Sequence, residues 1–191
     1  MTAWNDAIHR NAGNETAHKI GFYPSARFLQ DETFCRLLNE DLLKNCSPWE
    51  IRQATPKLWD QLPDEAGLYL FMWRPEQLNF RTESTSKSIP WCLYIGKTED
   101  SLKTRYKREY SNYLSEHRPA EFWDSAPVTS RAKRLSRLLT LTPLEFWYCV
   151  IERRDVISNL EERLIKVYNP PGNVKNRLRP TSVPFPAFRS Y

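Results

Sequence analysis

A carboxylate in the middle of an apolar helix face is the first sign of chemistry in this sequence. At about 100° per residue, segment 155–168 places Glu161 on one face with four apolar side chains: Ile157, Leu160, Leu164 and Tyr168. Burying a carboxylate costs free energy unless it is paired, hydrogen-bonded or bound to a cation. Two interpretations therefore stay open, a structural ion pair at the edge of the core or a metal ligand on the floor of a cleft. They differ in whether a basic partner or open space faces Glu161.

A second expected helix, over residues 101–114, also combines aromatic and charged groups. Its inward face is typical of a core helix and carries Leu102, Tyr106 and Tyr113, with Tyr110 at one border. Arg105 and Glu109 run along the other border, four residues apart, so an intrahelical salt bridge is the simplest interpretation. Such a bridge leaves one edge of the guanidinium free to bind a phosphate oxygen.

Short strands and helices must position these groups. Three segments rich in large apolar residues, 67–73, 91–95 and 145–151, are predicted strands. Residues 129–140 are predicted to form a short basic helix, and the helix over 155–168 is halted by Asn169-Pro-Pro-Gly172. This order predicts an α+β domain with helices packed against a small sheet.

The chain before the first strand is expected to be a helical N-terminal extension packed on the core. Residues 31–45 have apolar side chains at helical spacing. Ser47-Pro-Trp-Glu50 has the composition of another helix start, with serine at the cap, proline first in the helix and glutamate three residues after the cap. The expected divisions are the extension at 1–62, the domain at 63–178 with a long polar excursion at about 74–90, and a tail at 179–191.

Two tyrosine-bearing triplets and the two helices together resemble the GIY-YIG nuclease family. The triplets are Gly67-Leu-Tyr69 and Tyr94-Ile-Gly96, and Lys97 follows the second as it often does in that family. The family arginine lies in the next helix, three residues after a leucine, and corresponds to Arg105. The resemblance implies a small three-stranded antiparallel sheet flanked by helices.

The end of the domain carries the rest of the resemblance. The family glutamate, in a helix that ends in a proline turn, corresponds to Glu161, which agrees with the helical-face argument. The asparagine after that turn corresponds to Asn173, with Asn176 as a poorer substitute, and it is expected to fix local geometry through its amide. The resemblance covers about 110 of the 191 residues.

The sequence departs from the family pattern in two places. The triplets usually lie close together, but here 24 residues separate Tyr69 from Tyr94, so an insertion spans the hairpin. Family members often carry Tyr or His four residues after the arginine, whereas this chain has Glu109, followed by Tyr110. Either Tyr110 replaces that group after a small rotation, or Glu109 has another role.

The resemblance implies hydrolysis of phosphodiester bonds with one Mg²⁺ or Mn²⁺ per active site. Glu161 would hold the metal, which polarises the phosphate. Arg105 and Lys97 would neutralise charge on the non-bridging oxygens. Tyr69 or Tyr94 would orient and deprotonate the attacking water. The resemblance favours Tyr69 as the base, with Tyr94 positioning water or metal.

The charge distribution is uneven along the chain. Residues 1–66 contain 7 basic and 10 acidic side chains, whereas residues 67–191 contain 21 and 13. Such an asymmetry suits a polyanionic partner, because basic side chains that neutralise phosphates release counterions. A solvated basic surface is the other interpretation. The residues expected to contact nucleic acid are Arg131, Lys133, Arg134, Arg137, Lys175, Arg177 and Arg179.

Composition narrows the classes of protein. No apolar run approaches the length that crosses a bilayer, and residues 1–10 lack the apolar region of a signal peptide, so a cytoplasmic protein with no membrane contact is expected. The four cysteines contain no CxxC pair, which argues against a disulfide framework and a structural zinc site. With only three histidines, any metal site should use oxygen ligands, which favours magnesium or manganese.

The leading hypothesis is a standalone endonuclease of double-stranded DNA, of the restriction or defence type. One such site cuts one strand, so a double-strand break would need a homodimer, two binding events or sequential nicking. Two alternatives stay open: a catalytically silent nucleic-acid-binding protein that keeps the fold, and a nuclease that acts on RNA.

Overall fold

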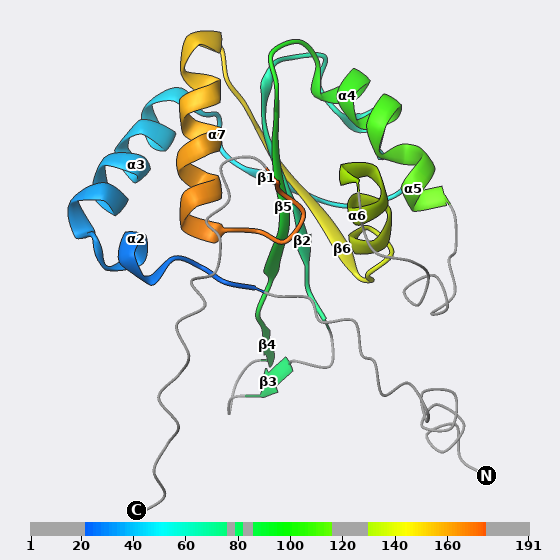
Figure 1. Cartoon of the computed structure of the whole chain (residues 1–191). Coiled ribbons are helices and arrows are strands. Elements are labelled where there is room, and N and C mark those ends of the chain that lie inside the picture. The colour runs from blue at the N-terminus through cyan, green and yellow to red at the C-terminus, as the bar shows by residue number, and fades with distance from the viewer. Residues whose placement is uncertain (1–21, 76–78, 82–85, 116–129, 175–191) are drawn as a thin grey trace, which may run out of the picture.

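The computed structural model describes residues 22–75, 79–81, 86–115 and 130–174, and these form a mixed α+β fold around a four-stranded antiparallel sheet (Figure 1). In spatial order the strands are β1 (Glu50–Gln53), β6 (Leu144–Val150), β2 (Gly67–Trp73) and β5 (Trp91–Thr98). The α+β class agrees with the sequence prediction. In the part of the chain described, no helix is long and apolar enough to cross a membrane.

Helices cover both faces of the sheet (Figure 1). On one face lie α7 (Arg154–Tyr168), α3 (Glu32–Asn45) and the short α2 (Ala26–Gln30). On the other lie α4 (Leu102–Glu109), α5 (Ser111–Ser115), α6 (Arg131–Leu138) and the 3₁₀ helix η1 (Leu58–Gln61). The predicted insertion contains a two-stranded antiparallel hairpin, β3 (Asn79–Arg81) and β4 (Ser86–Ser88).

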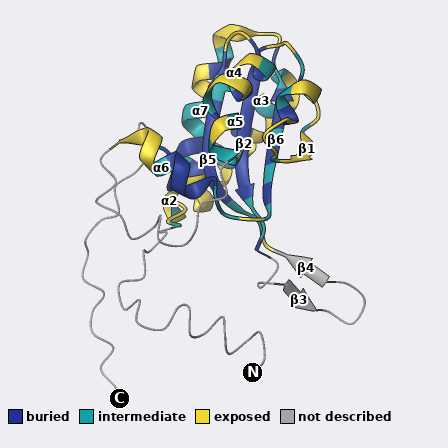
Figure 2. Ribbon diagram, turned by 90° about the vertical axis from the view of Figure 1, so that its right-hand side faces the viewer, coloured by how far each residue is buried: buried dark blue, intermediate teal, exposed yellow. Residues whose placement is uncertain are grey.

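The alternation of side chains along β2 divides the core in two. Leu68 and Leu70 belong to an aliphatic cluster with α3 and α7, whereas Tyr69 and Phe71 belong to an aromatic cluster with α4 and α6. This division follows from the two-residue period of a strand. Figure 2 shows the buried residues gathered along the central strands, with exposed residues on the outer turns of the helices.

The predicted three-stranded sheet is wrong by one strand, because β1 occupies the segment where a helix start was expected. Glu50–Gln53 pairs antiparallel with β6, from Tyr148 to Glu145. Ser47 extends this pairing instead of capping a helix, since its Oγ accepts a hydrogen bond from the Val150 backbone N–H at 2.9 Å. Long-range pairing therefore overrides the local helix-start signal.

The single helix predicted over residues 101–114 is interrupted at Tyr110. Ser101 caps the start of α4 by accepting a hydrogen bond from the Thr104 N–H at 2.9 Å. The helix ends at Glu109, and Tyr110 adopts φ −122° and ψ −31° before α5 begins. Tyr110 is buried and turns its phenol into the core, so the interruption places this side chain in the aromatic cluster.

The turn after α7 docks on the edge of β5. Gly172 donates its backbone N–H to the Leu93 carbonyl at 2.8 Å. The Asn173 side chain accepts from the Ile95 N–H at 2.9 Å and donates to the Ile95 carbonyl at 2.8 Å. A side chain at position 172 would place its Cβ 2.6 Å from the Leu93 carbonyl oxygen, so the close approach requires glycine.

Candidate active site

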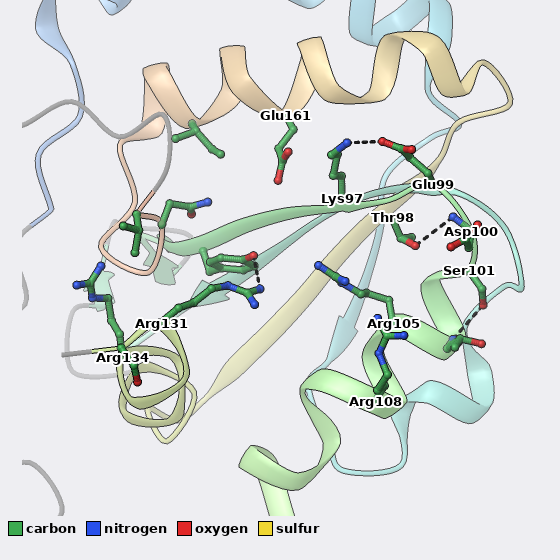
Figure 3. Close-up of a pocket in the computed structure, with 16 residues that line it drawn as sticks. Lys97, Thr98, Glu99, Asp100, Ser101, Arg105, Arg108, Arg131, Arg134 and Glu161 are labelled. Carbon is green, nitrogen blue, oxygen red and sulfur yellow. Dashed lines mark hydrogen bonds and ion pairs between the residues drawn. The ribbon is translucent and has the colours of Figure 1, made fainter. Parts of the chain in front are cut away.

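A pocket of about 750 Å³ lies over β5, between α7 and the helices α4 and α6 (Figure 3). Five of the six predicted catalytic residues line it: Tyr94, Lys97, Arg105, Glu161 and Asn173. They come from β5, α4, α7 and the turn after α7, so segments far apart in the sequence meet here. The sixth, Tyr69, is not among the lining residues.

Glu161 points from α7 into this pocket (Figure 3). Its helix neighbours Leu160 and Leu164 are buried in the core, and the carboxylate itself is half-buried. Among the described residues, no basic side chain lies within the 4 Å of an ion pair with Glu161, whereas Glu162 pairs with Lys166 at 2.8 Å. The described residues therefore do not include an ion-pair partner for Glu161, as the structural interpretation requires.

Opposing effects act on the Glu161 carboxyl. Burial raises its pKa, and the positive charges of Lys97, Arg105 and Arg131 act in the opposite direction. The net pKa lies above that of an ordinary glutamate. A cation bound at this carboxylate would relieve the cost of keeping it ionised.

Tyr168, expected on the same apolar face of α7 as Glu161, is instead 44% exposed.

Arg105, which lines the pocket, is hydrogen-bonded to the tyrosine of the first triplet. Arg105 Nη1 pairs with Glu109 Oε1 at 2.6 Å, and its Nε donates to the Tyr69 hydroxyl at 3.3 Å. Tyr69 is fully buried and shares a 2.7 Å hydrogen bond with the Tyr110 hydroxyl. Burial raises the pKa of Tyr69 above its ordinary value, and Arg105 opposes this rise only in part.

The glycine that ends the second triplet makes room for this tyrosine. Gly96 is the cross-strand partner of Tyr69. A Cβ at position 96 would lie 2.5 Å from Cζ and the hydroxyl oxygen of Tyr69. The triplet thus has a packing reason for its glycine, independent of any chemistry.

Tyr94, by contrast, reaches the pocket. Arg131 Nη2, from α6, donates to the Tyr94 hydroxyl at 2.8 Å, and the guanidinium carbon lies 5.4 Å from the centre of the Tyr94 ring. The sequence indicated Arg131 only as a member of a basic run. Its contact with Tyr94 depends on how α6 packs, which no local pattern reveals.

Lys97 links β5 to neighbouring elements. Its Nζ pairs with Glu99, in the loop after β5, and bonds the Ser158 hydroxyl on α7. The Lys97 ammonium thus lies at the pocket and is held in place by these two contacts. Arg108, which the sequence did not single out, lines the same pocket three residues after Arg105. The i, i+3 spacing on one helix was the available signal.

The predicted nucleic-acid contacts fare differently. Arg131 and Arg134 line the pocket, and Lys133 is exposed beside them. Arg137 is buried, with 7% of its surface exposed, so it does not lie on the surface where the prediction placed it. It lies on the inward side of α6, next to the buried Leu138. Lys175, Arg177 and Arg179 lie outside the described residues, as does Asn176.

The donor set fits magnesium or manganese with one protein ligand. Within the described residues, no group of three or more His, Cys, Asp or Glu side chains is placed to hold a metal ion. Mg²⁺ retains several waters and binds proteins through one or two carboxylates together with substrate phosphates. The Glu161 carboxylate, which faces the pocket and has no ion-pair partner among the described residues, meets that requirement.

No protein-family model, curated protein or solved structure matches this chain. The resemblance to GIY-YIG nucleases therefore rests on the residues themselves.

Proposed function

We propose that this chain is a metal-dependent endonuclease that hydrolyses phosphodiester bonds in DNA, as the GIY-YIG resemblance implies. One observation carries the proposal. Glu161, which has no ion-pair partner among the described residues, faces a pocket that carries five basic side chains: Lys97, Arg105, Arg108, Arg131 and Arg134. An acid with a purely structural role would be expected to pair with one of them.

The basic side chains suit a phosphate in this pocket. Arg105 and Lys97 would neutralise charge on its non-bridging oxygens as the pentacoordinate transition state forms. Glu161 would hold Mg²⁺ or Mn²⁺, and when bound the metal would supply Lewis-acid stabilisation of the phosphate and the leaving oxygen. Asn173 keeps β5 in place through its two bonds to Ile95.

For the proton of the attacking water we propose Tyr94, in place of the Tyr69 favoured from the resemblance. Tyr94 lines the pocket, and as a phenolate it would take the proton of the water and become a neutral phenol. The Arg131 guanidinium, which donates to its hydroxyl, would compensate the phenolate charge before that transfer. Tyr69 is fully buried, and its raised pKa opposes a role as base. Tyr69 instead positions Arg105 through its hydroxyl.

Incubation of the purified protein with supercoiled plasmid and Mg²⁺ tests this proposal. We expect nicking that EDTA abolishes and that Glu161→Gln reduces at least about 100-fold, because the metal contributes several kcal/mol to transition-state stabilisation. Glu162→Gln is the matched control, since it changes the adjacent carboxylate, whose Lys166 partner lies on the same helix. Equal nicking by wild type and Glu161→Gln would reject the proposed site.

Parallel substrates separate the alternatives. Wild-type protein that binds linear duplex but cleaves none of the DNA or structured-RNA substrates would be the silent binding protein. Cleavage of RNA alone would reassign the substrate. Nicks without linear product would indicate one strand cut per encounter, and linear product whose rate rises with the square of protein concentration would indicate a homodimer.

A further inference from the structure

Arg131 belongs to none of the positions that carry the GIY-YIG resemblance, yet its side chain enters the pocket. It is the first residue of α6. Ser130 caps this helix by accepting the Lys133 N–H at 3.2 Å, and the buried Leu135 and Leu138 anchor it to the core. The fold therefore fixes the point from which the Arg131 side chain extends over β5 (Figure 3).

One nitrogen of Arg131 makes all of its polar contacts with the described residues. Nη2 donates to the Tyr94 hydroxyl at 2.8 Å, and lies 3.4 Å from both the Tyr110 hydroxyl and Glu109 Oε2. Nε and Nη1 bond to no described residue. The side chain is 45% exposed and lines the pocket. A planar guanidinium is thus held at one corner, and its other donors are available to a ligand.

Glu109 holds arginines from two helices. Its Oε1 pairs with Arg105 Nη1 at 2.6 Å and with Arg108 Nη2 at 3.3 Å, while Oε2 pairs with Arg131. Three guanidinium groups compensate this one carboxylate, so it does not leave net negative charge against a phosphate. Glu109, which stands where family members often carry Tyr or His, therefore has a role in this arrangement. It sets the distance between the Arg105 and Arg131 guanidinium groups.

Tyrosines complete the link between the two arginines. Arg105 donates to the Tyr69 hydroxyl, Tyr69 bonds Tyr110, and Tyr110 lies within hydrogen-bond distance of Arg131. The chain of contacts is closed on its other side by Glu109. Groups fixed by such a network lose little freedom when they bind a ligand.

We propose that Arg131 is a second catalytic guanidinium, which with Arg105 binds the non-bridging oxygens of the scissile phosphate, and that Glu109 is the positioning residue for both. This inference rests on the proposed nuclease function. A purely structural role for Arg131 is a poor alternative, because an ion pair this exposed contributes little to stability. Two guanidinium groups would stabilise the extra charge of the transition state more than the charge of the ground state.

Single-turnover kinetics on an oligonucleotide duplex that the wild type cleaves tests the inference. Arg131→Ala should lower the rate of the chemical step about 100- to 1000-fold, with KM little changed. Arg131→Lys should recover part of this loss, because lysine restores the charge but not the planar donor set. Arg36→Ala is the matched control. Arg36 is an exposed arginine on α3 that pairs with Glu40 on the same helix, and neither residue lines this pocket. Melting curves should show all three variants folded.

Sulfur substitution at the scissile phosphate gives a readout that a structural role would not move. Each phosphorothioate diastereomer replaces one non-bridging oxygen, so a guanidinium that contacts that oxygen makes the wild type prefer one diastereomer. Arg131→Ala should reduce this preference about tenfold, the worth of one charged hydrogen bond. Glu109→Gln should reduce the rate less than Arg131→Ala and leave the preference in the same direction.

The outcomes separate the inference from the function on which it rests. A wild type that cleaves, together with an Arg131→Ala variant whose chemical step and diastereomer preference are unchanged, overturns the inference and leaves the nuclease proposal standing. A rise in KM and a weaker salt dependence without loss of rate would also overturn it, because Arg131 would then only bind the backbone. A wild type that cleaves no substrate removes the nuclease proposal and the inference with it.

Discussion

Replacement of Asn173 tests whether its side-chain amide stabilises the fold or takes part in the reaction. In Asn173→Ala, the Ile95 N–H and carbonyl each lose a buried partner, at 2.9 Å and 2.8 Å in the wild type. An unsatisfied buried backbone group costs about 1–3 kcal/mol, so the two together should lower the free energy of unfolding by roughly 2–6 kcal/mol. For a chain of this size each kcal/mol lowers Tm by about 2–4 °C.

Asn173→Asp sharpens this prediction. The aspartate can still accept the Ile95 N–H, but it presents an oxygen to the Ile95 carbonyl where the wild type has a donor. Its loss of stability should therefore match or exceed that of the alanine variant, and should lessen in acid, where the carboxyl gains a proton that it can donate.

Urea unfolding followed by circular dichroism measures these differences, and hydrogen exchange should show faster exchange at the Ile95 amide. Val174→Ala is the control, because it changes the adjacent side chain, which is 58% exposed. Wild-type stability in Asn173→Ala, combined with loss of plasmid nicking, would refute the reasoning and assign Asn173 to the chemistry.

Two further predictions concern Glu161 and Gly96. Without metal, Glu161→Gln should be about 1 kcal/mol more stable than the wild type at pH 7, because a half-buried carboxylate with no ion-pair partner among the described residues destabilises the fold when it is ionised. The sign follows from the raised pKa of Glu161: the ionised acid is penalised in the folded state above that pKa, and the difference should vanish below about pH 4, where the acid is protonated in both states. Thermal melts at both pH values measure this, and Mg²⁺ should raise the Tm of the wild type but not of the variant; a less stable variant at pH 7 would contradict it. Gly96→Ala should lose about 1–3 kcal/mol through overpacking, since its Cβ would lie 2.5 Å from Tyr69 Cζ. In a double-mutant cycle with Tyr69→Ala most of that loss should disappear, and strictly additive effects would exclude the proposed clash.

The sequence predicted those parts of the fold that local patterns determine. The strand predicted over 67–73 coincides with β2, and the helix predicted over 155–168 starts one residue late relative to α7. Both carry long apolar segments with clear ends. Glu161 could be found for the same reason, because the helical period alone places it on the inward side.

The missed features depend on contacts between distant segments. β1 has exposed side chains at all four positions, so it shows no alternation to detect, and its pairing with β6 cannot be read from Ser47-Pro-Trp-Glu50. The break at Tyr110 reflects its bond to Tyr69, 41 residues away. The link from Arg131 to Tyr94 likewise requires that α6 be docked first. Such tertiary preferences override local propensity.

The turn after α7 also decides how this molecule can meet other chains. With Leu93 and Ile95 bonded to Gly172 and Asn173, the middle of β5 offers no unpaired ladder to an incoming strand. Association by sheet continuation is thus blocked along this stretch of β5. The opposite border, β1, has only four residues, two of them the oppositely charged Glu50 and Arg52, which makes it a poor template for stacking copies into fibrils.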